Sequence, residues 1–364
     1  MKNLQNYFEK LYKEKSLNLF DIIIIRFLEL LSILYAIVLK IRESLYNSGY
    51  LKTTKIDIPV LSIGNITMGG TGKTSLCISL TRILQNKISD IAILSRGYKS
   101  KNKKTWALVS DGNKIMLSPE EAGDEPYLLA KKFPGIKVLI GKNRAFTALI
   151  AQCKFNARLI ILDDGFQQRK LRAKINIVLI DAKCPFGNYK LFPCGILRQS
   201  LDVLKKCNII IITNVNMVDE YKFLIDKIQD INPEIDIFTA QYRLVKIKSL
   251  LGDNSINIEE IRKKSVLVVS GIAHPEYFKQ TVQKFLNMEV KSIYYPDHYH
   301  YNIKDFKEIE KKALEYGCEI ILITEKDAVK FIPLSIPVYI VESEMKVNEE
   351  DKFREKISEF IALS

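Results

Sequence analysis

The segment from Ile58 to Leu84 constrains the fold more than any other part of the sequence. It opens with the apolar run IPVLSIGN, which is typical of a strand buried in a parallel sheet. A glycine-rich loop ending in Gly-Lys-Thr follows, and then SLCISLTRIL, whose apolar residues recur at helical spacing. Strand, loop and helix in this order form the P-loop arrangement. A doubly wound α/β sheet is the fold that this arrangement predicts.

The loop itself is expected to bind nucleotide phosphates. Its glycines allow backbone N–H groups to turn toward phosphate oxygens, and the following helix adds the positive end of its dipole. We expect Lys73 to reach the β- and γ-phosphates and the Thr74 hydroxyl to bind Mg²⁺. A chance Gly-Lys-Thr is the alternative, which the flanking strand and helix disfavour. The predicted phosphate-binding residues are Thr67, Met68, Gly69, Gly70, Thr71, Gly72, Lys73 and Thr74.

A second apolar run ends in two acids. The aliphatic residues at 159–162 are followed by Asp163, Asp164 and Gly165. Four aliphatic residues followed by an acid form a Walker B pattern, whose carboxylate holds Mg²⁺ directly or through water. Asp-Asp-Gly also favours a simple turn. Downstream of a P-loop, the pattern favours a metal role for Asp163 and Asp164.

Further strand-like runs alternate with helical stretches, at residues 91–95, 137–141, 175–181 and 207–213. Alternation of this kind indicates a doubly wound, mainly parallel sheet. Ligands of such sheets lie beyond the carboxyl ends of the strands. Arg96, Asp163 and Asp181 follow or close predicted strands, so we expect one shared site.

The organisation changes after Asn232-Pro233. Residues 238–250 resemble a β-linker, and a second, smaller α/β unit then begins with the apolar run at 266–270. We therefore predict an N-terminal membrane-associating region at 1–47, a P-loop core domain at 48–236 and a C-terminal α/β domain at 237–364.

The N-terminal region carries an apolar stretch at 17–39 that is interrupted by Asp21, Arg26 and Glu29. At 100° per residue the polar positions fall in one arc of about 140°, which predicts an amphipathic helix lying in a membrane interface. A single membrane span and a helix packed on the protein core remain alternatives. Four lysines that precede the stretch are placed to meet anionic lipid: Lys2, Lys10, Lys13 and Lys15. No signal-peptide cleavage pattern follows.

Composition adds two constraints. The 55 Lys and Arg outnumber the 42 Asp and Glu, and the formal charge of +13 favours anionic partners unless it reflects a lysine-rich proteome. No RNP string, zinc-finger spacing or recognition helix supports nucleic-acid binding. The six cysteines contain no C-x-x-C pair, as expected of reduced thiols in the cytoplasm.

Taken together, the motifs resemble one family, the tetraacyldisaccharide 4'-kinases of lipid A synthesis. The matching pieces are SIGNITMGGTGKT (62–74), LSRGY (94–98), GDEPYLLA (123–130), GKNR (141–144), LDDGFQQRKL (162–171), PFG (185–187), PCGILRQS (193–200), PDHY (296–299) and TEKDAVK (324–330). The resemblance covers nearly the whole chain. It implies a P-loop core, a smaller C-terminal domain, a cleft between them for ATP and a lipid disaccharide phosphate, and a hydrophobic N-terminal helix.

The resemblance also implies roles for individual residues. Asp124 becomes the candidate general base, although by itself its sequence position favours a helix N-cap. His298 is expected to orient Asp124, with Lys73 as the third catalytic residue, and Arg96 and Arg198 to clamp phosphates.

Two departures from the family pattern weaken other roles. Gln168 stands where the family usually has His, and Gln199 where it has Glu, so a metal role at 199 is disfavoured. The Thr324–Asp327 loop is compatible with nucleotide-base recognition or with a capped turn, and His274 is left unassigned.

The resemblance implies a Mg²⁺-dependent kinase that transfers the γ-phosphate of ATP to the 4'-hydroxyl of a tetraacyldisaccharide 1-phosphate. We expect a monomer, peripheral or monotopic at the cytoplasmic face of the inner membrane of a Gram-negative bacterium. The alternative is a membrane-associated ATPase switch of the partitioning or assembly type. The loop of such ATPases usually carries an extra lysine where this chain has Met68.

Overall fold

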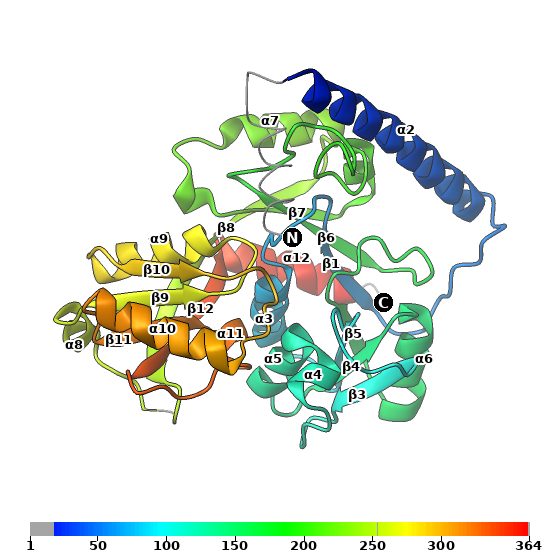
Figure 1. Ribbon diagram of the computed structural model, residues 1–364. Coiled ribbons are helices and arrows are strands. Elements are labelled where there is room, and N and C mark those ends of the chain that lie inside the picture. Colours follow the sequence, from blue (N-terminus) through cyan, green and yellow to red (C-terminus); the bar gives the residue numbers. More distant parts are fainter. Residues whose placement is uncertain (1–17, 253, 363–364) are drawn as a thin grey trace.

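A computed structural model describes residues 18–252 and 254–362, and the four lysines expected to meet lipid lie outside these residues. Its strands form one twelve-stranded sheet in the order β10-β9-β11-β12-β8-β7-β6-β1-β5-β2-β4-β3 (Figure 1). The strands are β1 (Val60–Asn65), β2 (Ile91–Ser95), β3 (Trp106–Ser110), β4 (Lys137–Gly141), β5 (Leu159–Leu162), β6 (Ile175–Asp181), β7 (Ile209–Thr213), β8 (Asp236–Ser249), β9 (Val266–Ser270), β10 (Lys291–Tyr294), β11 (Ile320–Thr324) and β12 (Val338–Val347).

Helices cover both faces of the sheet. They are α2 (Leu19–Asn47), α3 (Lys73–Leu84), α4 (Pro119–Ala122), α5 (Asp124–Lys132), α6 (Arg144–Phe155), α7 (Lys222–Ile231), α8 (Ile258–Arg262), α9 (Pro275–Leu286), α10 (Ile303–Glu315), α11 (Glu325–Ala328) and α12 (Glu350–Ala362), with short 3₁₀ turns η1 (Leu201–Lys206) and η2 (Val215–Met217). Alternate residues of β5 face opposite layers: Leu159 and Ile161 join the core under α3, and Ile160 and Leu162 the core under α6. The predicted doubly wound sheet is confirmed.

All strand pairs are parallel except β3 with β4 and β8 with β12. The predicted runs at 91–95, 137–141 and 175–181 coincide with β2, β4 and β6, and the run at 207–213 contains β7. Each contains at least three consecutive apolar residues because a central parallel strand is buried on both faces.

The strand β8 belongs to two parts of the sheet. Residues 236–239 pair with β7, whereas residues 240–249 pair with the antiparallel β12. The strands β9, β10 and β11 lie beyond β12 and pack against their own two hydrophobic clusters. The predicted boundary near residue 237 falls at the beginning of β8, and the division into three regions stays a prediction.

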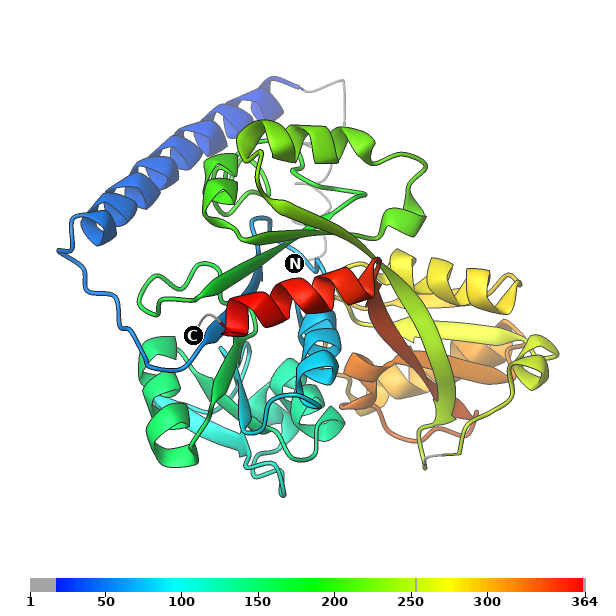
Figure 2. The same ribbon diagram turned by 180° about the vertical axis from the view of Figure 1, so that it is seen from behind.

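The last helix returns to the first part of the chain. Helix α12 lies beside α3 (Figure 2). Phe353 and Ile357 of α12 are fully buried in the same hydrophobic cluster as Leu76 and Leu80 of α3. The Phe353 ring meets Phe238 edge-on, with centroids 5.2 Å apart. The C-terminal segment therefore completes the core around the helix that follows the phosphate loop.

The helix α2 lies along the outside of the core (Figure 1). It begins at the N-cap Asn18, whose side chain accepts a hydrogen bond from the Asp21 backbone while the Asp21 carboxylate caps in return. By length and composition it is apolar enough to cross a membrane. Eleven of its large apolar side chains are 43–75% exposed: Leu19, Phe20, Ile22, Ile23, Phe27, Leu30, Ile33, Leu34, Ile37, Val38 and Ile41.

The polar side of α2 faces the protein. The Ser32 hydroxyl donates to the Leu191 carbonyl at 2.8 Å and accepts from the Cys194 N–H at 2.9 Å. Glu29 pairs with Lys190 at 2.5 Å, and Asp21 is buried. A helix lying in the membrane interface, as the sequence predicts, would turn Asp21, Arg26 and Glu29 together toward lipid headgroups, whereas of these three only Arg26 points outward. The arc of polar positions in the sequence identified the polar side of α2, but it did not show that this side meets the protein rather than lipid headgroups.

Because α12 contributes fully buried side chains, we expect it to be necessary for stability. Phe353→Ala should lower the free energy of unfolding by about 3–5 kcal/mol, the usual cost of emptying a buried aromatic site. Phe223→Ala, whose side chain is about half exposed on α7, serves as the control and should cost far less. Urea titrations followed by circular dichroism measure both. Equal losses would contradict this role of α12.

Candidate active site

The phosphate loop links the end of β1 to the beginning of α3. Gly69 and Gly72 have φ of 109° and 91°, which L side chains rarely adopt. The loop backbone is held by the segment after Pro193: the Met68 N–H donates to the Ile196 carbonyl, and the Arg198 N–H to the Ile66 carbonyl, both at 2.7 Å. Sequence reasoning placed the loop correctly but gave no sign of this second support.

Residues from the C-terminal half contact the loop. A Cβ added to Gly72 would lie 2.3 Å from the Met345 methyl carbon and 2.6 Å from the Tyr242 hydroxyl oxygen. A Cβ on Gly70 would lie 2.8 Å from that of Ala273, and His274, unassigned from sequence, borders Gly69. Glycine is thus required here by close approach as well as by conformation. No sequence motif pointed to Tyr242 or Met345.

The two acids predicted to bind metal lie beside the loop. Since β1 pairs in parallel with β5, Lys73 and Thr74 come next to the residues that follow β5. The Thr74 Oγ1 donates to Asp163 Oδ2 at 3.2 Å, and Lys73 Nζ lies 3.7 Å from Asp164 Oδ1. Arg198 also contacts Asp164, at 3.3 Å. The structure therefore brings five predicted residues into one cluster: Lys73, Thr74, Asp163, Asp164 and Arg198.

This cluster fits a divalent cation. Asp163 Oδ1 is buried and has no hydrogen-bond partner. Burial, together with the nearby Glu125 and Asp164 charges, raises the pKa of Asp163 to about 7. A hard cation would give the buried Asp163 oxygen a partner and would favour the ionised carboxylate, since such cations prefer carboxylate and hydroxyl oxygens. No group of three His, Cys, Asp or Glu meets as a metal site within the described residues. Mg²⁺ with nucleotides needs only one or two carboxylates, because phosphates and water supply the rest.

Asp124 is the first residue of α5, and the N-cap is Gly123 rather than Asp124. Its Oδ2 lies 3.1 Å from His298 Nδ1 and 2.8 Å from Lys330 Nζ. Burial raises the pKa of Asp124, but the hydrogen bonds from His298 and Lys330 and the positive charge of Lys330 outweigh it and lower the pKa to about 2. The predicted Asp124–His298 contact is thus present, although 174 residues separate the two in sequence.

The Thr324–Asp327 loop contributes to the same cluster. It forms a turn capped by Thr324, whose side chain accepts from the Asp327 N–H. Lys326 Nζ contacts His298 Nε2, Glu125 Oε1 and Asp297 Oδ1, each at 3.1 Å. The capped turn, one of the two alternatives from sequence, is therefore present.

Arginines differ in how they reach the site. Arg198 contacts Asp164, whereas Arg96 follows β2 with an exposed side chain. Sequence reasoning missed Arg144, which is 1% exposed and donates to the Gly141 carbonyl at 2.8 Å. Burial lowers the pKa of Arg144 to about 10, opposed by the Asp164 charge. Its position at the start of a helix after β4, in GKNR, was the available signal.

A second polar group lies at the ends of β6 and β7. Asn214 Nδ2 donates to Asp181 Oδ1 at 3.0 Å, and the Thr213 hydroxyl donates to the Thr71 carbonyl at 3.3 Å. Three buried oxygens here have no hydrogen-bond partner: Asp181 Oδ2, Asn214 Oδ1 and Asn216 Oδ1. Such acceptors suit N–H donors of a ligand, and the sequence pointed only to Asp181.

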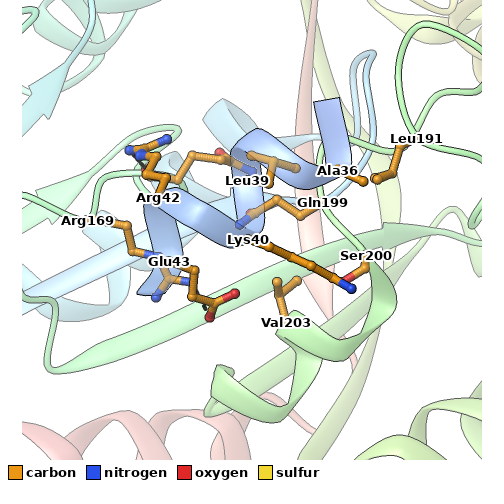
Figure 3. A pocket seen from close by; sticks show the side chains of 11 residues that line it. Ala36, Leu39, Lys40, Arg42, Glu43, Arg169, Leu191, Gln199, Ser200 and Val203 are labelled. Atoms are coloured by element: carbon orange, nitrogen blue, oxygen red, sulfur yellow. Dashed lines mark hydrogen bonds and ion pairs between the residues drawn. The ribbon is translucent and has the colours of Figure 1, made fainter. Parts of the chain in front are cut away.

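Gln199 lies away from the acid pair. It lines a small cavity of about 70 Å³ between α2 and the core, with Lys40, Arg42 and Glu43 on one side and Arg169 and Ser200 on the other (Figure 3). Gln168, the other departure, donates its N–H to the Gly165 carbonyl in the turn after β5. The glutamine at 199 therefore faces the cavity beside α2, where its buried Oε1 has no hydrogen-bond partner.

Comparison with known proteins identifies the family. The sequence model described as "Tetraacyldisaccharide-1-P 4'-kinase" matches residues 24–362. The chain belongs to this family. Tetraacyldisaccharide 4'-kinase from Halothermothrix orenii is 33% identical over 342 residues, which cover 91% of this chain and 89% of the relative. The Syntrophus aciditrophicus protein of the same name is 34% identical over 352 residues, 92% of each chain.

A solved structure agrees with the fold. The "apo" form of LpxK from Aquifex aeolicus, in complex with ATP, superposes with a TM-score of 0.71 at 29% identity and covers 91% of this chain and 97% of that one. The predicted family and fold class are confirmed, and membership in a kinase family confirms the expected class of enzyme. The ATPase switch is not favoured. The roles of single residues stay predictions.

The cluster at the phosphate loop predicts how activity depends on metal. Asp163→Asn and Asp164→Asn should each raise the Mg²⁺ concentration needed for half-maximal activity, because a neutral amide holds a divalent cation more weakly. Asp202→Asn, on η1, is the control and should leave the midpoint unchanged. Initial rates at fixed ATP over a Mg²⁺ titration give the midpoints. Unaltered midpoints in both acid variants would exclude the metal role.

Proposed function

We propose that this kinase transfers the γ-phosphate of ATP to the 4'-hydroxyl of a tetraacyldisaccharide 1-phosphate. The observation that carries the proposal is the meeting of Lys73 and Thr74 with Asp163 and Asp164 in a chain of this family. A phosphate cradle next to a carboxylate pair is the arrangement that phosphoryl transfer requires.

In the proposed reaction the acceptor oxygen attacks the γ-phosphorus, and the bond to the β–γ bridging oxygen breaks, leaving ADP. Asp124 takes the proton of the attacking hydroxyl, and His298 orients its carboxylate. Lys73 neutralises charge on the transferred group, while Arg96 and Arg198 hold substrate phosphates. Bound Mg²⁺ at Thr74, Asp163 and Asp164 supplies further charge neutralisation on the phosphates.

Replacing the loop lysine tests the proposal directly. Lys73→Ala should lower transfer of labelled phosphate from ATP to the lipid disaccharide by about 100-fold or more, as is usual for one key electrostatic group. Lys87→Ala, an exposed lysine just beyond α3, is the matched control and should retain activity. More than a tenth of the normal rate in Lys73→Ala would argue against the assignment. ATP hydrolysis without transfer to lipid would favour the ATPase switch.

We further propose that α2 attaches the protein to the cytoplasmic face of the inner membrane as a monotopic helix, with the protein a monomer. Its exposed apolar side and its protein-facing polar side support this placement, because contact with lipid would cover the apolar residues that the core leaves open. We also retain the three regions 1–47, 48–236 and 237–364 as functional units, with the strands β8 and β12 between the last two.

Vesicle binding tests the role of α2. Leu30 and Leu34 are 54% and 52% exposed, and the double replacement by Asp should weaken binding at least about tenfold, since burying one leucine contributes about 1.5–3 kcal/mol. The control makes the same change at Ile303 and Leu314, which are 71% and 70% exposed on α10. Equal binding by both double variants would refute membrane attachment through α2. Alkaline carbonate should extract the normal protein, whereas a spanning helix would stay in the pellet.

A further inference from the structure

Lys330 makes the shortest contact to the proposed base, yet the mechanism above gives it no role. Its Nζ lies 2.8 Å from Asp124 Oδ2, and both side chains are only 6% exposed. A buried pair of opposite charges is retained at considerable desolvation cost. The pair also joins distant parts of the chain, since Asp124 begins α5 and Lys330 follows α11.

Lys326 fixes the tautomer of the His298 imidazole, which lies between Lys326 and Asp124. A lysine ammonium has donors only, so His298 Nε2 must accept from Lys326 Nζ at 3.1 Å. The ring proton is then on Nδ1, which donates to Asp124 Oδ2 at 3.1 Å. His298 is itself held with φ of 57° and packs edge-on against the Tyr98 ring, with centroids 5.2 Å apart.

The contacts of His298 and Lys330 both end on the same oxygen of Asp124. They leave Oδ1 as the oxygen available to a substrate hydroxyl. We propose that Lys330 is a positioning residue that keeps Asp124 ionised and turned so that Oδ1 receives the acceptor proton, with Lys326 securing the histidine tautomer. This inference rests on the proposed role of Asp124 as the base.

The two lysines lie on a rigid support. The Asp327 side chain accepts from the Thr324 hydroxyl at 2.6 Å, the Tyr301 hydroxyl at 2.9 Å and the Gly271 N–H at 3.1 Å. An ion pair of 2.5 Å between Lys132 and Glu325 connects α5 to α11. Lys326 lies one residue before Asp327 and Lys330 three residues after it, so both lysines have little freedom to move relative to α5. The base is therefore assembled from two separate parts of the chain.

The charges around the base decide its response to pH. Besides His298 and Lys330, the neighbouring groups are Lys326 and the acids Glu125 and Asp297, which both contact Lys326. Burial and the two acids favour protonated Asp124, and the lysines oppose them. With Lys330 in place, the pKa of Asp124 is lowered to about 2. Only the ionised form can accept a proton, so activity falls as pH drops through this pKa.

The experiment compares Lys330→Met, Lys330→Arg and the control Lys311→Met, whose side chain is 77% exposed on α10. In Lys330→Met we expect kcat at neutral pH to fall at least about tenfold, in line with the cost of misplacing a catalytic group. Its acidic limb of kcat/KM should move up by about 1–3 pH units, since an opposite charge nearby lowers a carboxyl pKa by that amount. Lys330→Arg should keep the profile and restore part of kcat, and Lys311→Met should behave as the unmodified enzyme. Rates are measured from about pH 8 down to about pH 3, because the limb of Lys330→Met is expected at about pH 3–5 and that of the unmodified enzyme lies near 2.

Asp124→Asn distinguishes the proposed role of Asp124 as the base from the proposed role of Lys330 as a positioning residue. If it retains activity, Asp124 is not the base and the proposed mechanism fails. If it abolishes activity while Lys330→Met changes neither kcat nor the acidic limb, the mechanism stands and the role of Lys330 is refuted. A reduced kcat of Lys330→Met with an unchanged acidic limb of kcat/KM would also refute the role of Lys330, because loss of packing alone does not alter the ionisation of Asp124. If Lys330 acts through Asp124, the double variant should lose less than the sum of the two single losses.

Discussion

Parallel pairing of β1 with β5 is the constraint on which the rest of this protein depends. Both strands are fully buried, and their carboxyl ends meet at one edge of the sheet. The phosphate loop leaves one strand and the acid pair leaves the other, so that Thr74 and Asp163 come within hydrogen-bond distance. A shift of one residue in this register would turn every side chain of a strand to the opposite face. The catalytic geometry is therefore a consequence of the hydrophobic pattern of the core.

A second theme is the burial of charge between distant parts of the chain. Asp124, His298 and Lys330 are all largely buried, and each depends on the others for compensation of its desolvation. Met345, Tyr242 and the residues before α9 lie against the glycines of the phosphate loop. The two parts of the sheet are thus joined by the chemistry of the site as well as by β8 and β12.

The N-terminal helix inverts the usual arrangement of a surface helix. An amphipathic helix on a soluble protein buries its apolar side, whereas α2 places Ser32 and Asp21 against the protein and leaves its aliphatic side open. The segment that receives it, at 190–198, also supports the phosphate loop through Ile196 and Arg198. The Tyr35 hydroxyl donates to the Arg198 carbonyl at 3.0 Å. Since the Arg198 side chain contacts Asp164, a single residue connects α2 to the acid pair.

The sequence by itself determined the local features of this protein. Runs rich in aliphatic residues specified β1, β2, β4 and β6, because a strand buried on both faces needs them. Gly-Lys-Thr and Asp-Asp-Gly marked the phosphate loop and the acid pair, and the family motifs pointed to Asp124 and His298. Tertiary structure alone decided which surface the polar side of α2 meets, that Arg144 is buried, and that Lys330 reaches Asp124 across 206 residues. The physical reason is that periodicity and turn chemistry act within a few residues, whereas contacts between buried charges are set by the packing of strands far apart in the chain.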